Sequence, residues 1–149
     1  MIEVHRANLD SLDELVPLFE GYRAFYEMPA DAEGARAFLQ QRLERDESVI
    51  FIATLDGKPL GFTQLYPLFS STRMARLYLL NDLFVHADAR GTGLGAALLA
   101  RAYQHACEEG ACELMLETGN DNPARRLYER SGYEAITTRT FYARNVKKA

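Results

Sequence analysis

The chain has 149 residues, the length of one ordinary domain, and its 48% hydrophobic and 26% charged residues are typical of a folded globular protein. Its net charge of −4 argues against nucleic-acid binding as the main function. The chain lacks an apolar run of about 18 residues, and its first ten residues lack the basic start and apolar core of a signal peptide. We therefore expect a cytoplasmic protein without a membrane partner.

The first half of the chain predicts a strand, two helices and a β-hairpin. Apolar residues recur at helical spacing after a candidate cap at Asn8 or Asp10, and proline at Pro29 ends that helix. Two β-branched and aromatic runs flank the turn sequence 56–59, which indicates a hairpin. The expected elements are a strand at 2–6, helices at about 9–26 and 31–45, and strands at 48–55 and 60–68.

The second half predicts strands that alternate with helices. A strand at 76–85 leads through a glycine-rich turn into an Ala- and Leu-rich helix at 94–109, which ends at Gly110. We expect a buried strand at 112–117, a helix from Asn122-Pro123 to Arg130, and a last strand at 137–144. This order predicts an α/β fold whose sheet changes from antiparallel to parallel.

The turn between the 76–85 strand and the next helix predicts an anion site. Its sequence, Arg90-Gly91-Thr92-Gly93-Leu94-Gly95-Ala96, lets several backbone N–H groups point into one concavity beside a positive helix N-terminus. The same residues fit the loose dinucleotide pattern G-x-G-x-x-G/A. A Rossmann domain, however, places that turn after its first strand, and only one crossover fits after it here. A nucleotide-binding protein thus remains a weaker alternative.

Two motifs resemble the GNAT superfamily of acetyl-CoA-dependent N-acetyltransferases. Residues 81–85 (NDLFV) and 90–96 (RGTGLGA) are similar to its central strand and pyrophosphate loop. Residues 122–133 (NPARRLYERSGY) are similar to its A-x-x-L-Y-x-x-x-G-[FY] segment. The stretch around the loop looks most like the polyamine, thialysine and histone-type members.

The resemblance implies a single domain over residues 1–149, with a mixed, mostly antiparallel twisted sheet, about four flanking helices and a splay at the acetyl-CoA site. A backbone N–H of the central strand would polarise the thioester carbonyl. It also implies that coenzyme A contacts this strand, the glycine turn and the start of the last helix, at Leu83, Phe84, Val85, Arg90, Gly91, Thr92, Gly93, Leu94, Gly95, Ala96, Asn122, Pro123 and Ala124.

The expected catalytic residues are Tyr128, Asp82 and Asn81. Tyr128 matches the family tyrosine that protonates the leaving thiolate. Asn81 stands where related enzymes carry a glutamate base, and asparagine takes up no proton. Asp82 and a water relay through Asn81 are equal candidates for that task, and Glu117 ranks below them. Successive strand residues face opposite sides, so Asp82 does not simply inherit the role.

The acceptor is expected to be a primary amine held near Tyr26, Glu27 and Asp31 by cation–π and ion-pair contacts. Polyamines, lysine-like amino acids, basic peptides and aminoglycosides all remain open. The resemblance also implies a homodimer with the C-terminal strand near the partner. The three histidines and two cysteines lack metal-ligand spacing, so we expect no metal. The loss of the glutamate leaves one further alternative, a GNAT-like protein that binds acyl-CoA without turnover.

Overall fold

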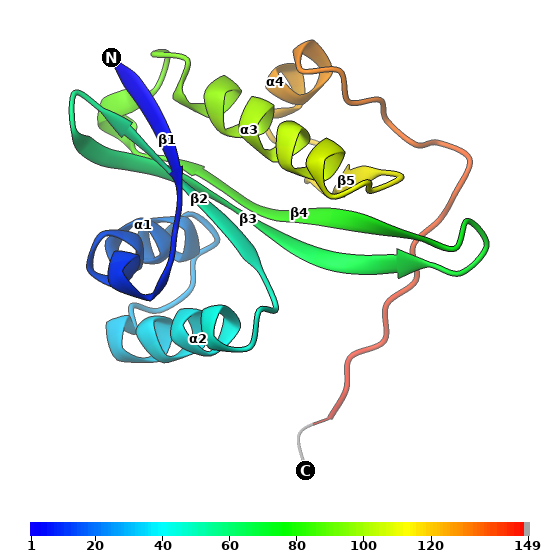
Figure 1. Ribbon diagram of the computed structural model, residues 1–149, viewed down its shortest axis with the longest axis horizontal. Helices are drawn as coiled ribbons and strands as arrows, with labels where there is room; N and C mark the ends of the chain where they lie inside the picture. Colours follow the sequence, from blue (N-terminus) through cyan, green and yellow to red (C-terminus); the bar gives the residue numbers. More distant parts are fainter. Residues whose placement is uncertain (148–149) are drawn as a thin grey trace.

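A five-stranded sheet in the order β1-β2-β3-β4-β5 forms the centre of the computed structural model, which describes residues 1–147 (Figure 1). The first four strands are antiparallel to their neighbours, and β5 is parallel to β4. The α/β fold and the change of strand direction are therefore as predicted. The strands are β1 (Ile2–Arg6), β2 (Val49–Leu55), β3 (Lys58–Ser70), β4 (Ala75–Val85) and β5 (Leu114–Leu116).

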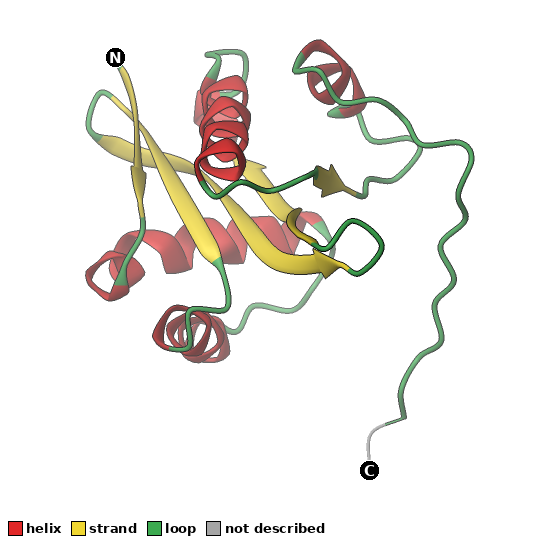
Figure 2. Ribbon diagram, turned by 45° about the vertical axis from the view of Figure 1, so that its right-hand side comes forward, coloured by secondary structure: helices red, strands yellow, loops and turns green. Residues whose placement is uncertain are grey.

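Helices cover both faces of the sheet (Figure 2). On one face, α1 (Leu12–Phe25) and α2 (Ala32–Glu44) bury an apolar stripe against β2 and β3. On the other, α3 (Leu94–Glu108) packs with its buried leucines on β2, β3 and β4. The short helix α4 (Arg125–Arg130) lies beside the N-terminal part of α3, where Leu127 contacts the Cβ position of Gly95. Two 3₁₀ turns, η1 (Leu9–Ser11) and η2 (Ala87–Ala89), complete the elements.

The sheet opens between β4 and β5. The parallel ladder joins only residues 78–80 of β4 to 114–116 of β5, although β4 continues to Val85 in register with β3. Beyond Leu80, the β5 side of β4 has no strand partner within the described residues. This opening is the expected splay.

A β-bulge interrupts β4 at the opening. Gln64 pairs with Asp82 but Leu65 pairs with Leu80, so Asn81 is the extra residue. Leu80 and Leu83, three residues apart, consequently both pack in the α3 core, whereas a regular strand would turn them to opposite faces. The bulge decides which β4 side chains face the opening.

The last predicted strand, at 137–144, is wrong. Residues 134–147 belong to no strand or helix and make no backbone hydrogen bond with another described residue. Their Thr-, Phe- and Tyr-rich sequence suits a strand, but a strand needs backbone pairing with a partner edge. Here Arg139 only forms an ion pair with Glu113 beside β5, at 3.9 Å, and the end of the segment extends away from the sheet (Figure 1). The strand predicted at 112–117 and the helix predicted from residue 122 are present in shorter form, as β5 and α4.

Across residues 1–147, none of the helices combines the length and the apolar character that crossing a bilayer requires.

Candidate functional site

A cavity of about 670 Å³ lies at the opening of the sheet. Its walls are the end of β4, the glycine turn, the start of α3, the residues after β5, and α4. The C-terminal end of α1 closes one side with three aromatic residues. The cavity therefore gathers segments that the sequence separates by more than 100 residues.

The glycine turn presents backbone donors to this cavity. Gly91 and Gly93 have φ values of +77° and +93°, in the left-handed region that favours glycine. The helical ladder of α3 starts with the Ala97 N–H donating to the Gly93 carbonyl, so the N–H groups of residues 94–96 precede it. A Cβ on Gly91 would meet nothing within 4 Å, so the turn leaves room for a ligand. Arg90 adds an exposed cationic side chain.

Most residues predicted to bind coenzyme A line the cavity. Leu83, Phe84 and Val85 do so from β4, and the turn contributes all its members except Thr92, whose hydroxyl donates to the Ala89 carbonyl instead. Asn122, Pro123 and Ala124 line it from the loop before α4. The structure thus brings twelve of the thirteen predicted residues to one surface.

Three polar residues follow β5 before the proline at 123: Asn120, Asp121 and Asn122. Asn122 lines the cavity, and its Oδ1 accepts a hydrogen bond from the Ala124 N–H at 2.9 Å. Asn120 and Asp121 are not part of the lining; the Asn120 carbonyl accepts from the Arg125 side chain. Glu117 lines the cavity at the splay.

Tyr128 lines the cavity from α4. Its ring packs edge-on against the Tyr133 ring, with centroids 6.2 Å apart. Burial raises the pKa of Tyr128 above its ordinary value, and the nearby Tyr26 phenol adds to this effect. The phenol consequently keeps its proton at neutral pH and is available as a donor.

Asn81 and Asp82 occupy different environments although their side chains touch. Asn81 is exposed and lines the cavity, whereas Asp82 is 2% exposed and does not line it. The Asn81 Nδ2 donates to Asp82 Oδ1 at 2.6 Å, and Gln64 Nε2 donates to Asp82 Oδ2 at 2.6 Å. Burial raises the pKa of Asp82, and the two amide donors oppose that rise. The bulge explains the contact, because it breaks the alternation that would separate the two side chains.

Three aromatic residues of α1 and its C-terminal end line the cavity: Tyr22, Phe25 and Tyr26. Tyr22 donates its hydroxyl proton to the Asn81 carbonyl at 3.0 Å, which fastens α1 to the bulge. The Tyr26 ring packs edge-on against both Tyr22 and Phe25. Of the three, only Tyr26 was an expected site residue; the helical spacing of all three aromatic residues was the available signal for Tyr22 and Phe25.

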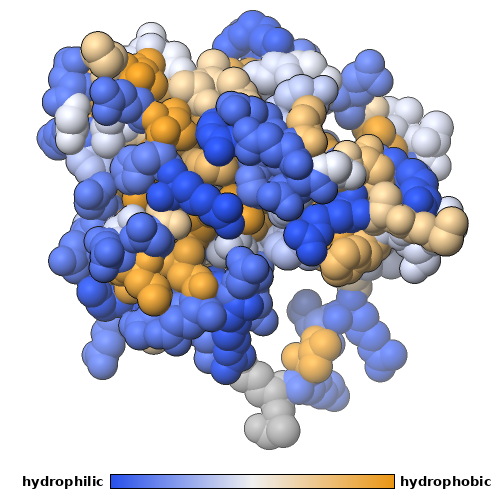
Figure 3. All heavy atoms as spheres, viewed as in Figure 1, coloured by the Kyte–Doolittle hydropathy of each residue, from blue (hydrophilic) through white to orange (hydrophobic). Residues whose placement is uncertain are grey.

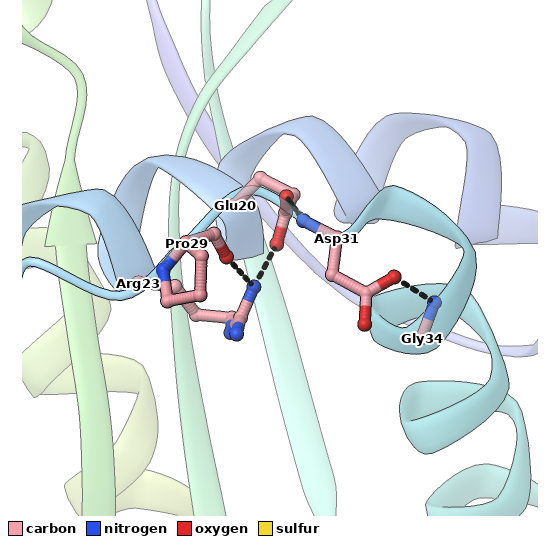
Figure 4. A network of polar contacts seen from close by, with 5 residues as sticks. All are labelled: Glu20, Arg23, Pro29, Asp31 and Gly34. Carbon is pink, nitrogen blue, oxygen red and sulfur yellow. Dashed lines mark hydrogen bonds and ion pairs between the residues drawn. The ribbon is translucent and has the colours of Figure 1, made fainter.

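Glu27 and Asp31, the other predicted acceptor residues, do not line the cavity. The Asp31 carboxylate caps α2 by accepting from the Gly34 N–H at 2.9 Å, while the Asp31 N–H donates to Glu20 (Figure 4). Arg23 binds Glu20 and the Pro29 carbonyl, and its hydrogen bond is the main reason that the pKa of Glu20 is lowered. This network fixes the segment that connects α1 and α2. That segment directly follows the aromatic wall, the side of the cavity formed by Tyr22, Phe25 and Tyr26.

Within residues 1–147, the structure contains no group of three or more His, Cys, Asp or Glu side chains that could hold a metal ion.

Comparisons with known proteins agree with this geometry. Residues 15–133 match the model of the Acetyltransferase (GNAT) family. An uncharacterized N-acetyltransferase of Bacillus subtilis is 47% identical over 146 residues, which cover 97% of this chain and 98% of that protein. A probable acetyltransferase of Haemophilus influenzae is 32% identical and covers 87% of this chain and 98% of its own.

Solved structures share the fold. The crystal structure of a probable acetyltransferase superposes with a TM-score of 0.92 at 39% identity, covering 99% of both chains. An aminoglycoside N-acetyltransferase solved in complex with CoA has a TM-score of 0.81 at 19% identity, covering 98% of this chain and 96% of its own.

Proposed function

The chain belongs to the GNAT family of acetyltransferases, and from this premise we propose that it transfers the acetyl group of acetyl-CoA directly to a primary amine, with residues 1–149 acting as a single domain. The observation that most supports this proposal is that one cavity combines the backbone donors of the glycine turn, the open edge of β4 and Tyr128. Membership of the GNAT family supports the acyl-transfer part of this proposal. The aromatic side chains of Tyr22, Phe25 and Tyr26, together with Asn81, support the part that makes the acceptor an amine.

Acetyl-CoA fits the cavity residues by its chemistry. The N–H groups at the start of α3 and Arg90 suit a pyrophosphate, since both are donors to anions. The pantetheine arm is an amide chain, which pairs with an exposed strand edge such as the β5 side of residues 83–85. When bound, acetyl-CoA would supply the activated acetyl group.

The residues of this chain would then orient the thioester and the amine and protonate the departing sulfur. A backbone N–H of β4 polarises the thioester carbonyl, and Asn81 accepts a hydrogen bond from the amine or from a relay water. The amine nitrogen forms the new amide bond as the C–S bond breaks. Tyr128 donates its proton to the departing sulfur, and the proton lost by the amine leaves through water.

A thiol-release assay with acetyl-CoA and a panel of amines tests this function. The panel contains a polyamine, a lysine-like amino acid, a basic peptide and an aminoglycoside. We expect acetyl-CoA consumption with at least one amine and no consumption with the matched alcohol. Binding of acetyl-CoA without turnover of any amine would instead favour a non-catalytic acyl-CoA-binding protein, the alternative suggested by Asn81. Stabilisation by NAD rather than acetyl-CoA would contradict both.

We also propose that the enzyme is a homodimer in which residues 134–147 of one copy pair with the β5 edge of another. The segment is exposed, with Phe141 at 72% and Tyr142 at 94%, and Figure 3 displays apolar atoms on the part that extends from the body. It carries Arg139, Arg144 and Lys147, whereas residues 102–124 around β5 contain acidic residues but no Lys or Arg. Arg139 forms an ion pair with Glu113 of its own chain at 3.9 Å, so the charges of Arg144 and Lys147 are the ones that would complement the acidic region of another copy.

Thr140→Pro tests the dimer, because proline removes a backbone N–H that a strand would need. We expect wild-type protein to have twice the mass of one chain by light scattering, and the variant to dissociate about tenfold more readily, the effect of roughly one to two lost hydrogen bonds. Thr140→Val is the matched control, since it keeps the N–H and strand propensity. A wild-type monomer at every concentration would disprove the dimer.

A further inference from the structure

The hydrogen bonds around Asp82 determine how the Asn81 amide is oriented. Both Asp82 oxygens accept from side-chain amides, Oδ1 from Asn81 and Oδ2 from Gln64. Because the Asn81 Nδ2 is the donor in this contact, the NH₂ end of Asn81 faces the Asp82 carboxyl group. The remaining polar atom of that amide is the carbonyl oxygen Oδ1, and Asn81 is the exposed member of the pair that lines the cavity.

We propose that Asp82 is a positioning residue that turns the Asn81 Oδ1 toward the acceptor amine, so that this oxygen receives an N–H of the substrate or of its relay water. The inference rests on the proposed function and deepens it. It explains how an asparagine serves where a carboxylate is usual. A free amide could present either its donor or its acceptor end, and only the acceptor end suits an amine that arrives with N–H donors.

The fold restrains this pair from several sides. The Thr63 hydroxyl donates to the Asp82 carbonyl at 2.8 Å, and Tyr22 donates to the Asn81 carbonyl at 3.0 Å. The bulge places both side chains together, which a regular strand would prevent. Asp82 is too enclosed, at 2% exposure, to touch the amine itself. Its influence therefore passes through Asn81.

The other titratable groups near Asp82 do not titrate in the assay range. Tyr22 approaches from α1 and Tyr66 from β3, and burial raises the pKa of both phenols well above the usual value of 10.0. The positive charge of Arg42, from α2, opposes the rise in the pKa of Tyr66. A change in the pH profile between pH 6 and 9 is consequently assignable to the Asn81–Asp82 pair, the amine, or a group on the cavity side.

Asp82→Asn is the first test, because it keeps the shape and removes the acceptor-only partner. We expect kcat/KM for the amine to fall about tenfold at every pH from 6 to 9, through KM more than kcat, with the acetyl-CoA affinity within about twofold of wild type. A loss concentrated at low pH that recovers toward pH 9 would show that Asp82 is instead the general base. An unchanged amine KM would overturn the proposal.

The exchange variant Asn81→Asp/Asp82→Asn separates positioning from simple structural support. It rebuilds the carboxylate–amide contact in reverse and places a carboxylate oxygen in the cavity. We expect recovery of the amine KM and a pH profile that levels off at lower pH than wild type, since a carboxylate base is now present. A merely structural Asp82 predicts no recovery over Asp82→Asn. Thr63→Val is the matched control, because it removes only the hydrogen bond to the Asp82 backbone carbonyl, keeps both hydrogen bonds to the Asp82 carboxylate, and should leave the amine KM unchanged.

A readout that needs no turnover keeps this inference separate from the proposed function. The side-chain amide protons of Asn81, observed by NMR in ¹⁵N-labelled protein, should resonate downfield in wild type because of the carboxylate bond. They should move upfield in Asp82→Asn. An unshifted pair in the wild type overturns the orientation itself, whereas failure of every amine in the activity assay, with the downfield pair present, contradicts only the proposed function.

Discussion

Tyr128→Phe is expected to lower kcat by about 10²–10⁴-fold while the affinity for acetyl-CoA stays nearly unchanged, if the phenol protonates the departing thiolate. The ring keeps its place in the cavity wall and its packing against Tyr133, so only the proton donor is lost. The loss corresponds to about 3–5 kcal/mol of transition-state stabilisation. Burial raises the pKa of Tyr128, which keeps the donor protonated over the range in which the enzyme would be assayed.

Tyr133→Phe is the matched control for this prediction. Its hydroxyl oxygen is buried, forms no hydrogen bond within the described residues, and belongs to a ring that does not line the cavity. Its removal should therefore change neither kcat nor the acetyl-CoA Kd. If Tyr128→Phe turns over as fast as this control, thiolate departure needs no help from the phenol and Tyr128 has only a packing role.

The glycine turn and the parallel crossover were predictable because local chemistry determines them. Alternating glycines before an Ala- and Leu-rich run specify a turn with positive φ followed by a helix, and residues 91–96 form this arrangement. A crossover helix between parallel strands then places the turn at the sheet opening. The expected coenzyme A residues gather at the cavity for this reason.

The environment of Asp82 was not predictable in the same way. The bulge at Asn81 depends on the register between β3 and β4, and no single residue in the sequence predicts it. Strand alternation alone would turn the side chains of Asn81 and Asp82 to opposite faces, whereas in the structure these side chains are hydrogen-bonded to each other. The aromatic wall similarly depends on tertiary packing, because Tyr22 and Phe25 have the same helical spacing as core residues. Residues 137–144 have strand propensity, but pairing requires an edge that local sequence does not supply.

Gly93→Asp is expected to remove most of the stabilisation that acetyl-CoA gives the folded protein. At 100 times its Kd, a ligand that binds only the folded state adds about 2.7 kcal/mol, which for a domain of this size is a rise in Tm of about 5–10 °C. The substitution puts a negative charge at the N-cap of α3, where the pyrophosphate is proposed to bind. Repulsion between the two anions should remove most of that rise, measured by thermal unfolding with and without acetyl-CoA.

The fold itself should tolerate the Gly93→Asp change, so a loss of the acetyl-CoA effect can be distinguished from a failure to fold. A Cβ at residue 93 would meet only the Ile2 side chain, at 3.9 Å, although the φ of +93° strains any residue other than glycine. Gly110→Asp places the same residue at another positive-φ glycine, at the other end of α3, with φ +66° and nothing within 4 Å; the strain is milder there and the position lies outside the cavity. That control should lose some stability yet keep the full rise in Tm. A full rise in Gly93→Asp as well would mean that the phosphates bind elsewhere, because the rise is measured with and without acetyl-CoA in the same variant and therefore does not depend on that variant's own strain or capping.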